Sequence, residues 1–309
     1  MKSEAFQICS LLAGSLFFIS CARPQPGVSA TTVIPSGGKG YAMAIGLNHF
    51  SARTYGNEGK LQGCVHDATD MINIAKTQGF QTAPLLLNED ATRDKVVAAI
   101  RTAKSKLKSG DTFVLSYSGH GAQSYDTNGD ERDDHRDETW CLYDGMMTDD
   151  KLAQLWSEFA DGVRILVFSD SCFSGTVIKA YNEDGTINKD ADPLTKALPE
   201  DLLTELRNRP ENLSLDLRIP DEITSKSRTS AAVVLISGCD DDQKSQDGNR
   251  NGRFTGALRN IWGNGAFHGS LGKFHEDIKN SINDSNQTPN FDRTGDYNKR
   301  FEAQRPWTQ

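Results

Sequence analysis

The sequence predicts an α/β fold in which a mostly parallel central sheet carries helices on both faces. Short buried-strand patterns alternate with amphipathic helical patterns along most of the chain, which is typical of βαβ units. Two of the strands, within residues 113–121 and 165–175, are apolar runs that end abruptly in small residues and glycine. With 309 residues, the chain suffices for one large domain of this class or at most two ordinary ones.

The elements of the N-terminal half follow from hydrophobic periodicity. Residues 92–107 give the clearest helix, because Val96 and Ile100 recur on one face while Arg93 and Lys104 lie on the other. In chain order we expect a strand at 41–47, a polar loop at 48–63, a helix at 64–78, a short strand at 82–87 and the helix at 92–107.

The C-terminal half continues the alternation with two interruptions. Residues 122–147 are acidic and predicted to be irregular, and residues 176–228 are predicted to form a polar insertion, because they hold four prolines and no strong periodicity. The acidic stretch 247–252 is expected to be a solvated loop. The other expected elements are a helix at 149–160, strands at 163–169 and 231–237, helices at 254–262 and 271–282, and an edge strand after residue 288.

The N-terminal stretch differs from the rest. Lys2 precedes an apolar run at residues 6–19, which is too short to span a bilayer but has the length of a signal-peptide core. Residues 18–21 (FISC) resemble a bacterial lipoprotein cleavage box that ends in Cys21. We predict a signal peptide at 1–21 and export to the cell envelope or periplasm with a lipid on Cys21, the alternative being a cytoplasmic protein. The further expected parts are a flexible tether at 22–39, the main domain at 40–290 and a C-terminal tail at 291–309.

Composition limits the partners. A formal net charge of −8 argues against nucleic acid, whose phosphates need a basic surface, and suits basic ligands instead. Membrane contact is expected only through an N-terminal lipid, and we expect a monomer. The sequence has no CxxC pair and no Cys/His cluster with zinc spacing, so Cys64, Cys141 and Cys239 are predicted to be buried small hydrophobes.

The reactive side chains are expected where two strands end. His120 follows one apolar strand and Cys172 follows another, and the carboxyl ends of parallel strands share one edge of a sheet. A thiol and an imidazole at that edge make a nucleophile and its base. The backbone N–H groups of Gly121 and Cys172 are the candidates for stabilising the oxyanion, because glycine lets the main chain approach closely.

At these residues the sequence resembles the metacaspases and the wider caspase-like cysteine peptidases. The resemblance lies in four pieces that follow the family's order, namely residues 61–68 (LQGCVHDA), 117–121 (YSGHG), 170–175 (DSCFSG), and 236–239 (ISGC) with 251–255 (NGRFT). It implies a caspase-like three-layer sandwich and cleavage after Arg or Lys. It also implies an acidic substrate pocket that includes Asp67, Ser118 and Asp170, where a carboxylate would pair with the cationic side chain.

The resemblance raises calcium as an activator, although the chemistry itself needs no cofactor. The positions that match the carboxylate site of many metacaspases are Asp137, Asp149 and Asp150. Where the family carries a further Asp after the catalytic Cys, this chain has Lys179, which opposes a bound cation.

The predicted function is therefore a cysteine endopeptidase with a Cys172/His120 dyad that acts on proteins or peptides with basic residues. The alternatives are a catalytically silent caspase-like binding module tethered to the envelope, and a thiol enzyme that transfers acyl groups. Self-cleavage in the insertion is a further hypothesis, because that segment holds the basic residues Lys179, Lys189, Lys196, Arg207, Arg209, Arg218, Lys226 and Arg228.

Overall fold

The computed structural model describes residues 37–125, 136–172, 195–198, 200–207, 229–240 and 243–309. The predicted signal peptide, most of the tether and most of the insertion, including Lys179, lie outside the described residues. Within the described part, no helix is long and apolar enough to cross a membrane.

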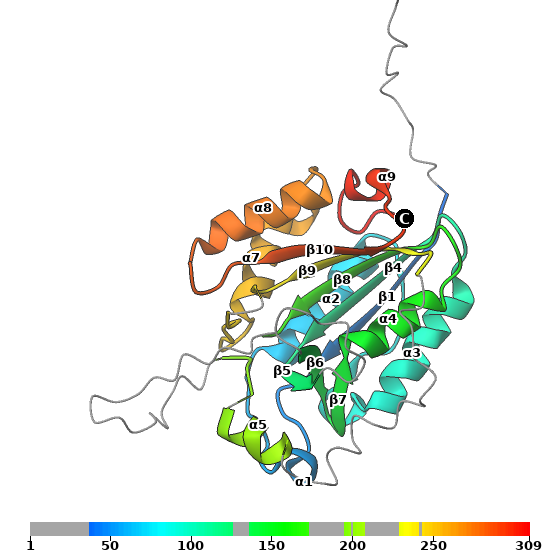
Figure 1. Ribbon diagram of the computed structural model, residues 1–309. Coiled ribbons are helices and arrows are strands. Elements are labelled where there is room, and N and C mark those ends of the chain that lie inside the picture. The colour runs from blue at the N-terminus through cyan, green and yellow to red at the C-terminus, as the bar shows by residue number, and fades with distance from the viewer. Residues whose placement is uncertain (1–36, 126–135, 173–194, 199, 208–228, 241–242) are drawn as a thin grey trace, which may run out of the picture. The chain divides into compact units, whose positions relative to one another are not determined.

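A largely parallel sheet forms the centre of the domain (Figure 1). Its strand order is β10-β9-β8-β4-β1-β2, and β3 also pairs with β1. All seven residues of β1, β4 and β8 are buried, as expected for parallel strands covered on both faces. The strands are β1 (Gly40–Gly46), β2 (Gln81–Thr82), β3 (Leu86–Leu87), β4 (Thr112–Ser118), β8 (Arg164–Asp170), β9 (Ala232–Ser237) and the antiparallel edge strand β10 (Asn290–Gly295).

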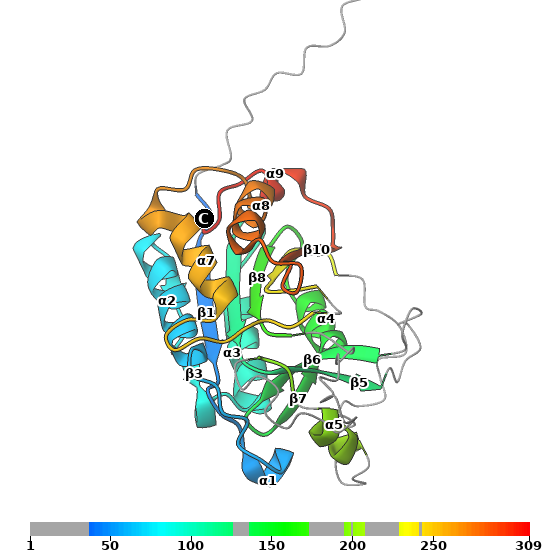
Figure 2. The ribbon, with the colours of Figure 1, turned by 90° about the vertical axis from the view of Figure 1, so that its left-hand side faces the viewer.

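Helices cover both faces of this sheet, which confirms the predicted three-layer α/β arrangement (Figure 2). α3 (Arg93–Lys106) and α4 (Asp149–Ser157) share one apolar core with the sheet. α2 (Cys64–Thr77), α7 (Arg253–Trp262) and α8 (Leu271–Ile282) share the other. The hydroxyl oxygens of Thr148 and Ser270 cap α4 and α8 by accepting hydrogen bonds from main-chain N–H groups, so these helices begin where a capping residue stands.

Residues 122–147, predicted to be irregular, instead contribute to a second, antiparallel sheet. It comprises β5 (Gly121–Tyr125), β6 (Arg136–Leu142) and β7 (Gly145–Thr148). The prediction was wrong because these strands bury polar residues: the hydroxyl of Thr139 on β6 donates to the Ala122 carbonyl of β5 over 3.0 Å. A buried polar side chain whose partner lies on a neighbouring strand gives no hydrophobic signal in the sequence.

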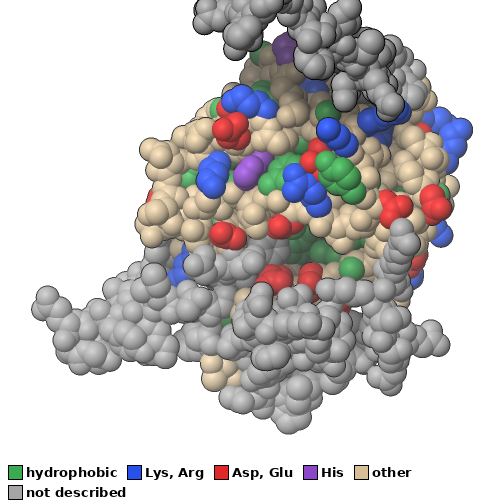
Figure 3. Space-filling model, turned by 45° about the horizontal axis from the view of Figure 1, so that its top comes forward, with side chains coloured by type: hydrophobic (Ala, Val, Ile, Leu, Met, Phe, Trp, Pro, Cys, Tyr) green, Lys and Arg blue, Asp and Glu red, His purple; other side chains and the backbone are tan. Residues whose placement is uncertain are grey.

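Residues 291–309, expected as a C-terminal tail, supply most of β10 and α9 (Lys299–Glu302), and they place Phe301 and Trp307 in the same core as α7 and α8. Short helical segments complete the described elements, namely α1 (Ala52–Tyr55), α5 (Glu200–Arg207) and the 3-10 helices η1 (Asn88–Asp90) and η2 (Gly263–Gly265). On the face that Figure 3 shows, side chains of both charge signs are interspersed.

Candidate active site

The two reactive motifs meet at the carboxyl ends of neighbouring strands. Ser118 at the end of β4 pairs with Asp170 at the end of β8, and His120 and Cys172 each follow two residues later. The main chains are in close contact just beyond this pair, because a Cβ added to Gly121 would lie 1.6 Å from the Cys172 carbonyl oxygen. The fold therefore brings the predicted nucleophile, base and oxyanion donors to one edge of the sheet.

His120 is held in an apolar setting. Its Nε2 atom lies 3.0 Å from the Gly59 carbonyl oxygen, and its ring packs 5.4 Å from the Phe50 ring, centroid to centroid. Burial lowers the pKa of His120 to about 4, although the backbone groups of Gly59 and Ala197 partly oppose this shift. The imidazole is consequently neutral near pH 7, which is the form that accepts a proton from a thiol.

The Cys172 side chain is completely buried. Its Sγ atom accepts a hydrogen bond of 2.9 Å from the N–H of Ser245, a residue of the loop that follows β9. All four cysteines in the described residues are buried thiols, including Cys64, Cys141 and Cys239.

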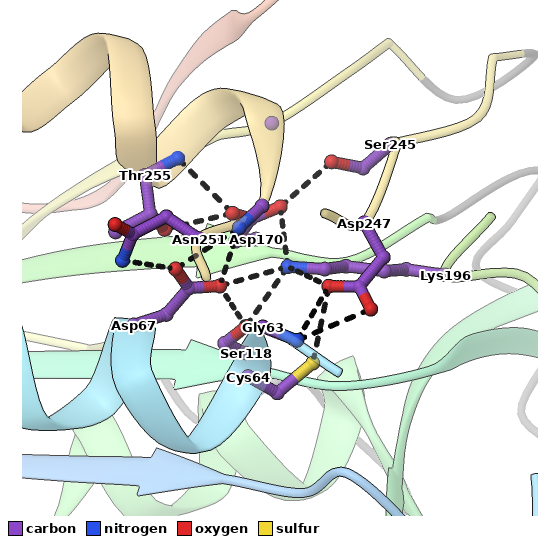
Figure 4. A network of polar contacts seen from close by, with 12 residues as sticks. Gly63, Cys64, Asp67, Ser118, Asp170, Lys196, Ser245, Asp247, Asn251 and Thr255 are labelled. Atoms are coloured by element: carbon purple, nitrogen blue, oxygen red, sulfur yellow. Dashed lines mark hydrogen bonds and ion pairs between the residues drawn. The ribbon is translucent and has the colours of Figure 1, made fainter. Parts of the chain in front are cut away.

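The three predicted pocket residues come together from α2, β4 and β8 (Figure 4). The hydroxyl of Ser118 donates to Asp67 over 2.7 Å, and Asp67 and Asp170 each lie 3.0 Å from one buried ammonium. That ammonium belongs to Lys196 of the insertion, whose side chain has no solvent exposure. The chain thus fills its own acidic pocket with a lysine.

Backbone and side-chain donors fix the two carboxylates. Asp170 accepts hydrogen bonds from the main-chain N–H of Thr255 over 3.0 Å and from its hydroxyl over 2.7 Å. Asp67 accepts from the Gly252 N–H over 3.1 Å and from the Asn251 amide over 2.9 Å. The pocket is therefore preorganised for a cation, because its carboxylates cannot turn away to find other partners.

Asp247 is a third pocket carboxylate, and the expectation that residues 247–252 form a solvated loop was wrong at this residue. Its side chain is buried, accepts hydrogen bonds from the main-chain N–H groups of Gln62 and Gly63, and lies 3.9 Å from the Lys196 ammonium. The acidic composition of the stretch gave no signal for burial, because the donors lie about 185 positions earlier in the chain.

Three carboxylates surround the one ammonium of Lys196, and the charges shift each other's pKa values. Burial alone lowers the pKa of Lys196, but Asp170 and Asp67 outweigh it, so this pKa lies well above its ordinary value. Burial raises the pKa of Asp67, and Lys196 opposes that shift. Ligand atoms of Cys64, Asp67 and Asp247 lie within 4.8 Å of one another, as a metal site would require. The Lys196 ammonium lies 3.0 Å from Asp67 and 3.9 Å from Asp247, so this cluster already contacts a cation.

Residues 195–198 lie along the reactive groups and are held there by two isolated β-bridges, at Thr195 and Ala197, with a bend at Lys196 between them. The Lys196 N–H donates to the Ser245 carbonyl over 2.9 Å, and the Lys196 carbonyl accepts from the Gly121 N–H over 2.8 Å. One residue to the N-terminal side, Thr195 forms an antiparallel bridge with Gln246. The carbonyl oxygen of Lys196 itself therefore accepts a hydrogen bond from a predicted oxyanion donor, the Gly121 N–H.

The residues expected to bind calcium lie near one end of the small sheet. Asp149 and Asp150 are the first residues of α4, and β6 pairs with β7 so that Thr139 stands opposite Thr148. Asp137 lies on β6 two residues before Thr139, and its side chain lies outside the described residues. Carboxylates are suitable calcium ligands, so the residue types fit this metal.

Comparison with known proteins identifies the class. A model of the caspase domain family, peptidase C14, matches residues 39–308, and the chain belongs to this family. Within the family it is similar to metacaspases: it is 30% identical over 281 residues to Metacaspase-1 of Pyricularia oryzae, covering 80% of this chain and 68% of that protein. Metacaspase-1 of Mycosarcoma maydis is 29% identical over 251 residues, and the chain spans 60% of its length. These findings confirm the resemblance inferred from the four sequence motifs.

Two solved structures have a similar fold. A crystal structure of a Geobacter sulfurreducens protein has 42% sequence identity and a TM-score of 0.72, covering 87% of this chain and 98% of that one. Caspase-1 of Spodoptera frugiperda has 11% identity and a TM-score of 0.50, covering 84% of this chain and 86% of that one, and it supports the fold alone.

Proposed function

We propose that the chain is a cysteine endopeptidase that cleaves after Lys or Arg, and that its own Lys196–Ala197 bond is its first substrate. The observation that carries the proposal is the placement of Lys196, whose ammonium fills the acidic pocket while its carbonyl accepts the Gly121 N–H. A substrate with a basic residue before the cleaved bond would use the same contacts.

In the proposed reaction, His120 takes the proton of the Cys172 thiol and the sulfur attacks the carbonyl carbon of Lys196. The N–H groups of Gly121 and Cys172 stabilise the oxyanion. The carbon–nitrogen bond then breaks, and His120 returns the proton to the nitrogen of Ala197, which leaves as a new N-terminus. Water hydrolyses the remaining thioester and regenerates the thiol.

Intact-mass measurement tests self-cleavage. The wild-type chain is expected to give two fragments that join at Lys196 and Ala197, whereas Cys172→Ala stays whole. Lys196→Gln should block this cut, while Lys196→Arg should keep it, because arginine retains the charge that the pocket binds. Lys189→Gln, another change in the insertion, is the matched control. Recovery of the wild-type chain whole, like Cys172→Ala, would reject self-cleavage.

Reporter peptides test the specificity and the competing functions. The purified chain is expected to cleave peptides with Arg or Lys before the reporter group and to leave the Asp peptide intact. A silent binding module would cleave none of them. An acyl transferase would form an amide when an amine is added, so product analysis distinguishes transfer from hydrolysis.

We also propose that calcium acts as an activator outside the reaction itself, supported by the carboxylates of Asp149 and Asp150 at the start of α4. Calcium titration by calorimetry into Cys172→Ala, with the double variant Asp149→Asn/Asp150→Asn as control, is expected to show binding only in the former. Heat of equal size in both proteins would place calcium elsewhere.

Export with a lipid on Cys21 is a separate proposal, supported by the residue pattern of 1–21. Expression of the full chain and of Cys21→Ser, followed by membrane fractionation, is expected to show membrane association only for the former.

A further inference from the structure

Backbone hydrogen bonds hold Leu198 in place, as they hold the pocket lysine. Its N–H donates to the Gly121 carbonyl over 3.2 Å, and Gly121 forms a parallel bridge with Ala197. Gly121 thus bonds the chain on both sides of the Lys196–Ala197 bond. Leu198, the second residue after that bond, is left with only 1% of its side chain exposed.

Leu198 belongs to a small apolar cluster that is separate from the two main cores. The cluster joins it to Phe50 and Tyr55 of the α1 region and to Ala122 and Cys141 of the small sheet. The further members, Leu202, Leu203 and Leu206, come from α5, which follows in the chain. The aliphatic side chain is therefore enclosed by apolar groups rather than lying against solvent.

The apolar residues of this cluster lie next to the proposed catalytic groups. Ala122 directly follows Gly121, and the Phe50 ring lies 5.4 Å from the His120 ring and 4.1 Å from the Tyr55 ring. The hydroxyl of Tyr55 donates to the Leu142 carbonyl over 2.8 Å, which holds this wall against the small sheet. The cluster therefore keeps a set position relative to the bond that would be cut.

We propose that this cluster, formed by Phe50, Tyr55, Ala122 and Cys141, is a substrate subsite that selects an aliphatic residue, leucine above all, at the second position after the cleaved bond. The inference rests on the proposed function, since it names the class of substrate for the same site: peptides with a basic residue, any small residue, and then leucine. A carboxylate at the leucine position would be buried without a partner, which disfavours acidic residues there.

Quenched fluorescent peptides test the subsite. The parent peptide carries the chain's own sequence from 193 to 202, and its variants replace the leucine that corresponds to Leu198 by Ala or Asp. A further peptide exchanges the alanine and leucine after the lysine, which keeps the composition constant. With the wild-type enzyme, kcat/KM is expected to fall about 10-fold to 100-fold for the Asp peptide, and less for the Ala peptide and the exchanged peptide.

A lysine reporter that ends in aminocoumarin has no residues after the cut bond and therefore measures the proposed function alone. Equal kcat/KM for the Leu and Asp peptides, with the coumarin reporter cleaved, would overturn the subsite and leave the peptidase assignment standing. Absence of cleavage in every substrate, the coumarin included, would overturn both.

Self-cleavage of the full chain gives a second measurement. Leu198→Asp should slow the loss of intact chain about 10-fold or more, while Leu198→Ile should stay within about 3-fold of the wild type. Unchanged self-cleavage in Leu198→Asp would contradict the subsite. Because Leu198 also docks its own segment against the cluster, the peptide series, in which the substrate is a separate molecule and the enzyme keeps its own Leu198, separates recognition from docking.

Discussion

The ammonium of Lys196 lies 3.0 Å from a carboxylate oxygen of Asp170, and neither side chain reaches solvent beyond 2% of its surface. Such a pair costs several kcal/mol in desolvation per ion, which its mutual attraction and further hydrogen bonds must offset. Here Asp67, Asp247 and Ser118 supply those contacts. The segment that carries Lys196 therefore occupies the pocket with a positive charge, as we propose that a basic residue of a substrate would.

Asp67→Asn tests the charge of the pocket. The amide keeps the size of the carboxylate but removes a charge-assisted hydrogen bond worth about 1.5–3 kcal/mol. We expect kcat/KM on Lys and Arg reporters to fall roughly 10-fold to 100-fold, as measured by initial rates. Asp94→Asn, at an exposed position of α3, is the control and should behave like the wild type. If the pocket binds its substrates without this charge, Asp67→Asn and Asp94→Asn will have equal kcat/KM.

Lys196→Ala tests whether the lysine holds its segment in place. The change leaves Asp67, Asp170 and Asp247 facing one another without the cation. We expect the segment to leave the pocket so that water can reach these carboxylates. In a Cys172→Ala background, hydrogen exchange should become faster at residues 195–207 and at the Gly121 amide, with β4 and β8 unaffected.

Lys273→Ala, which removes an exposed lysine from α8, is the matched control for that experiment and should leave the exchange pattern unchanged. If residues 195–207 stay as protected in Lys196→Ala as in the parent, Leu198 and α5 rather than the ion pairs hold the segment.

The pH dependence of stability follows from His120. Burial lowers the pKa of His120 from an ordinary 6.5 to about 4. Between pH 6.5 and pH 4, His120 is therefore protonated in the unfolded chain and neutral in the folded chain. The contribution of His120 to the free energy of unfolding is therefore complete above pH 6.5, and it declines as the pH falls toward 4. Urea unfolding of Cys172→Ala should lose roughly 3 kcal/mol more over this range than Cys172→Ala/His120→Gln. If the free energies of unfolding of the two variants change equally with pH, His120 is protonated equally in the folded and unfolded states.

The parts of the fold that the sequence predicted are those with a hydrophobic period. The predicted helix at 92–107 became α3 (Arg93–Lys106), and the apolar strands that precede His120 and Cys172 became β4 and β8. The motifs around Asp67, Ser118 and Asp170 likewise converge on one pocket.

What the sequence could not predict depends on long-range pairing. Lys196 was one of several basic residues in the insertion, and its selection depends on Asp67, which lies 129 positions away. Asp247 looked like any solvated carboxylate until the N–H groups of Gln62 and Gly63 were placed beside it. The same holds for β5, β6 and β7, where buried polar residues such as Thr139 find their partners only after the strands pair.

Gly121→Ala tests the close approach of the two reactive motifs. A Cβ at this position would lie 1.6 Å from the Cys172 carbonyl oxygen, a backbone atom that cannot move without shifting the nucleophile. We expect the free energy of unfolding to fall by about 3 kcal/mol and peptidase activity to be lost. Gly272→Ala in α8 is the control, because its Cβ would meet nothing within 4 Å. Gly272 is the second residue of α8, so alanine there should stabilise that variant by less than the roughly 1 kcal/mol of a helix interior. Wild-type activity and stability in Gly121→Ala would mean that the Gly121 main chain does not approach Cys172 as closely as described, and the oxyanion donors would then have to be sought elsewhere.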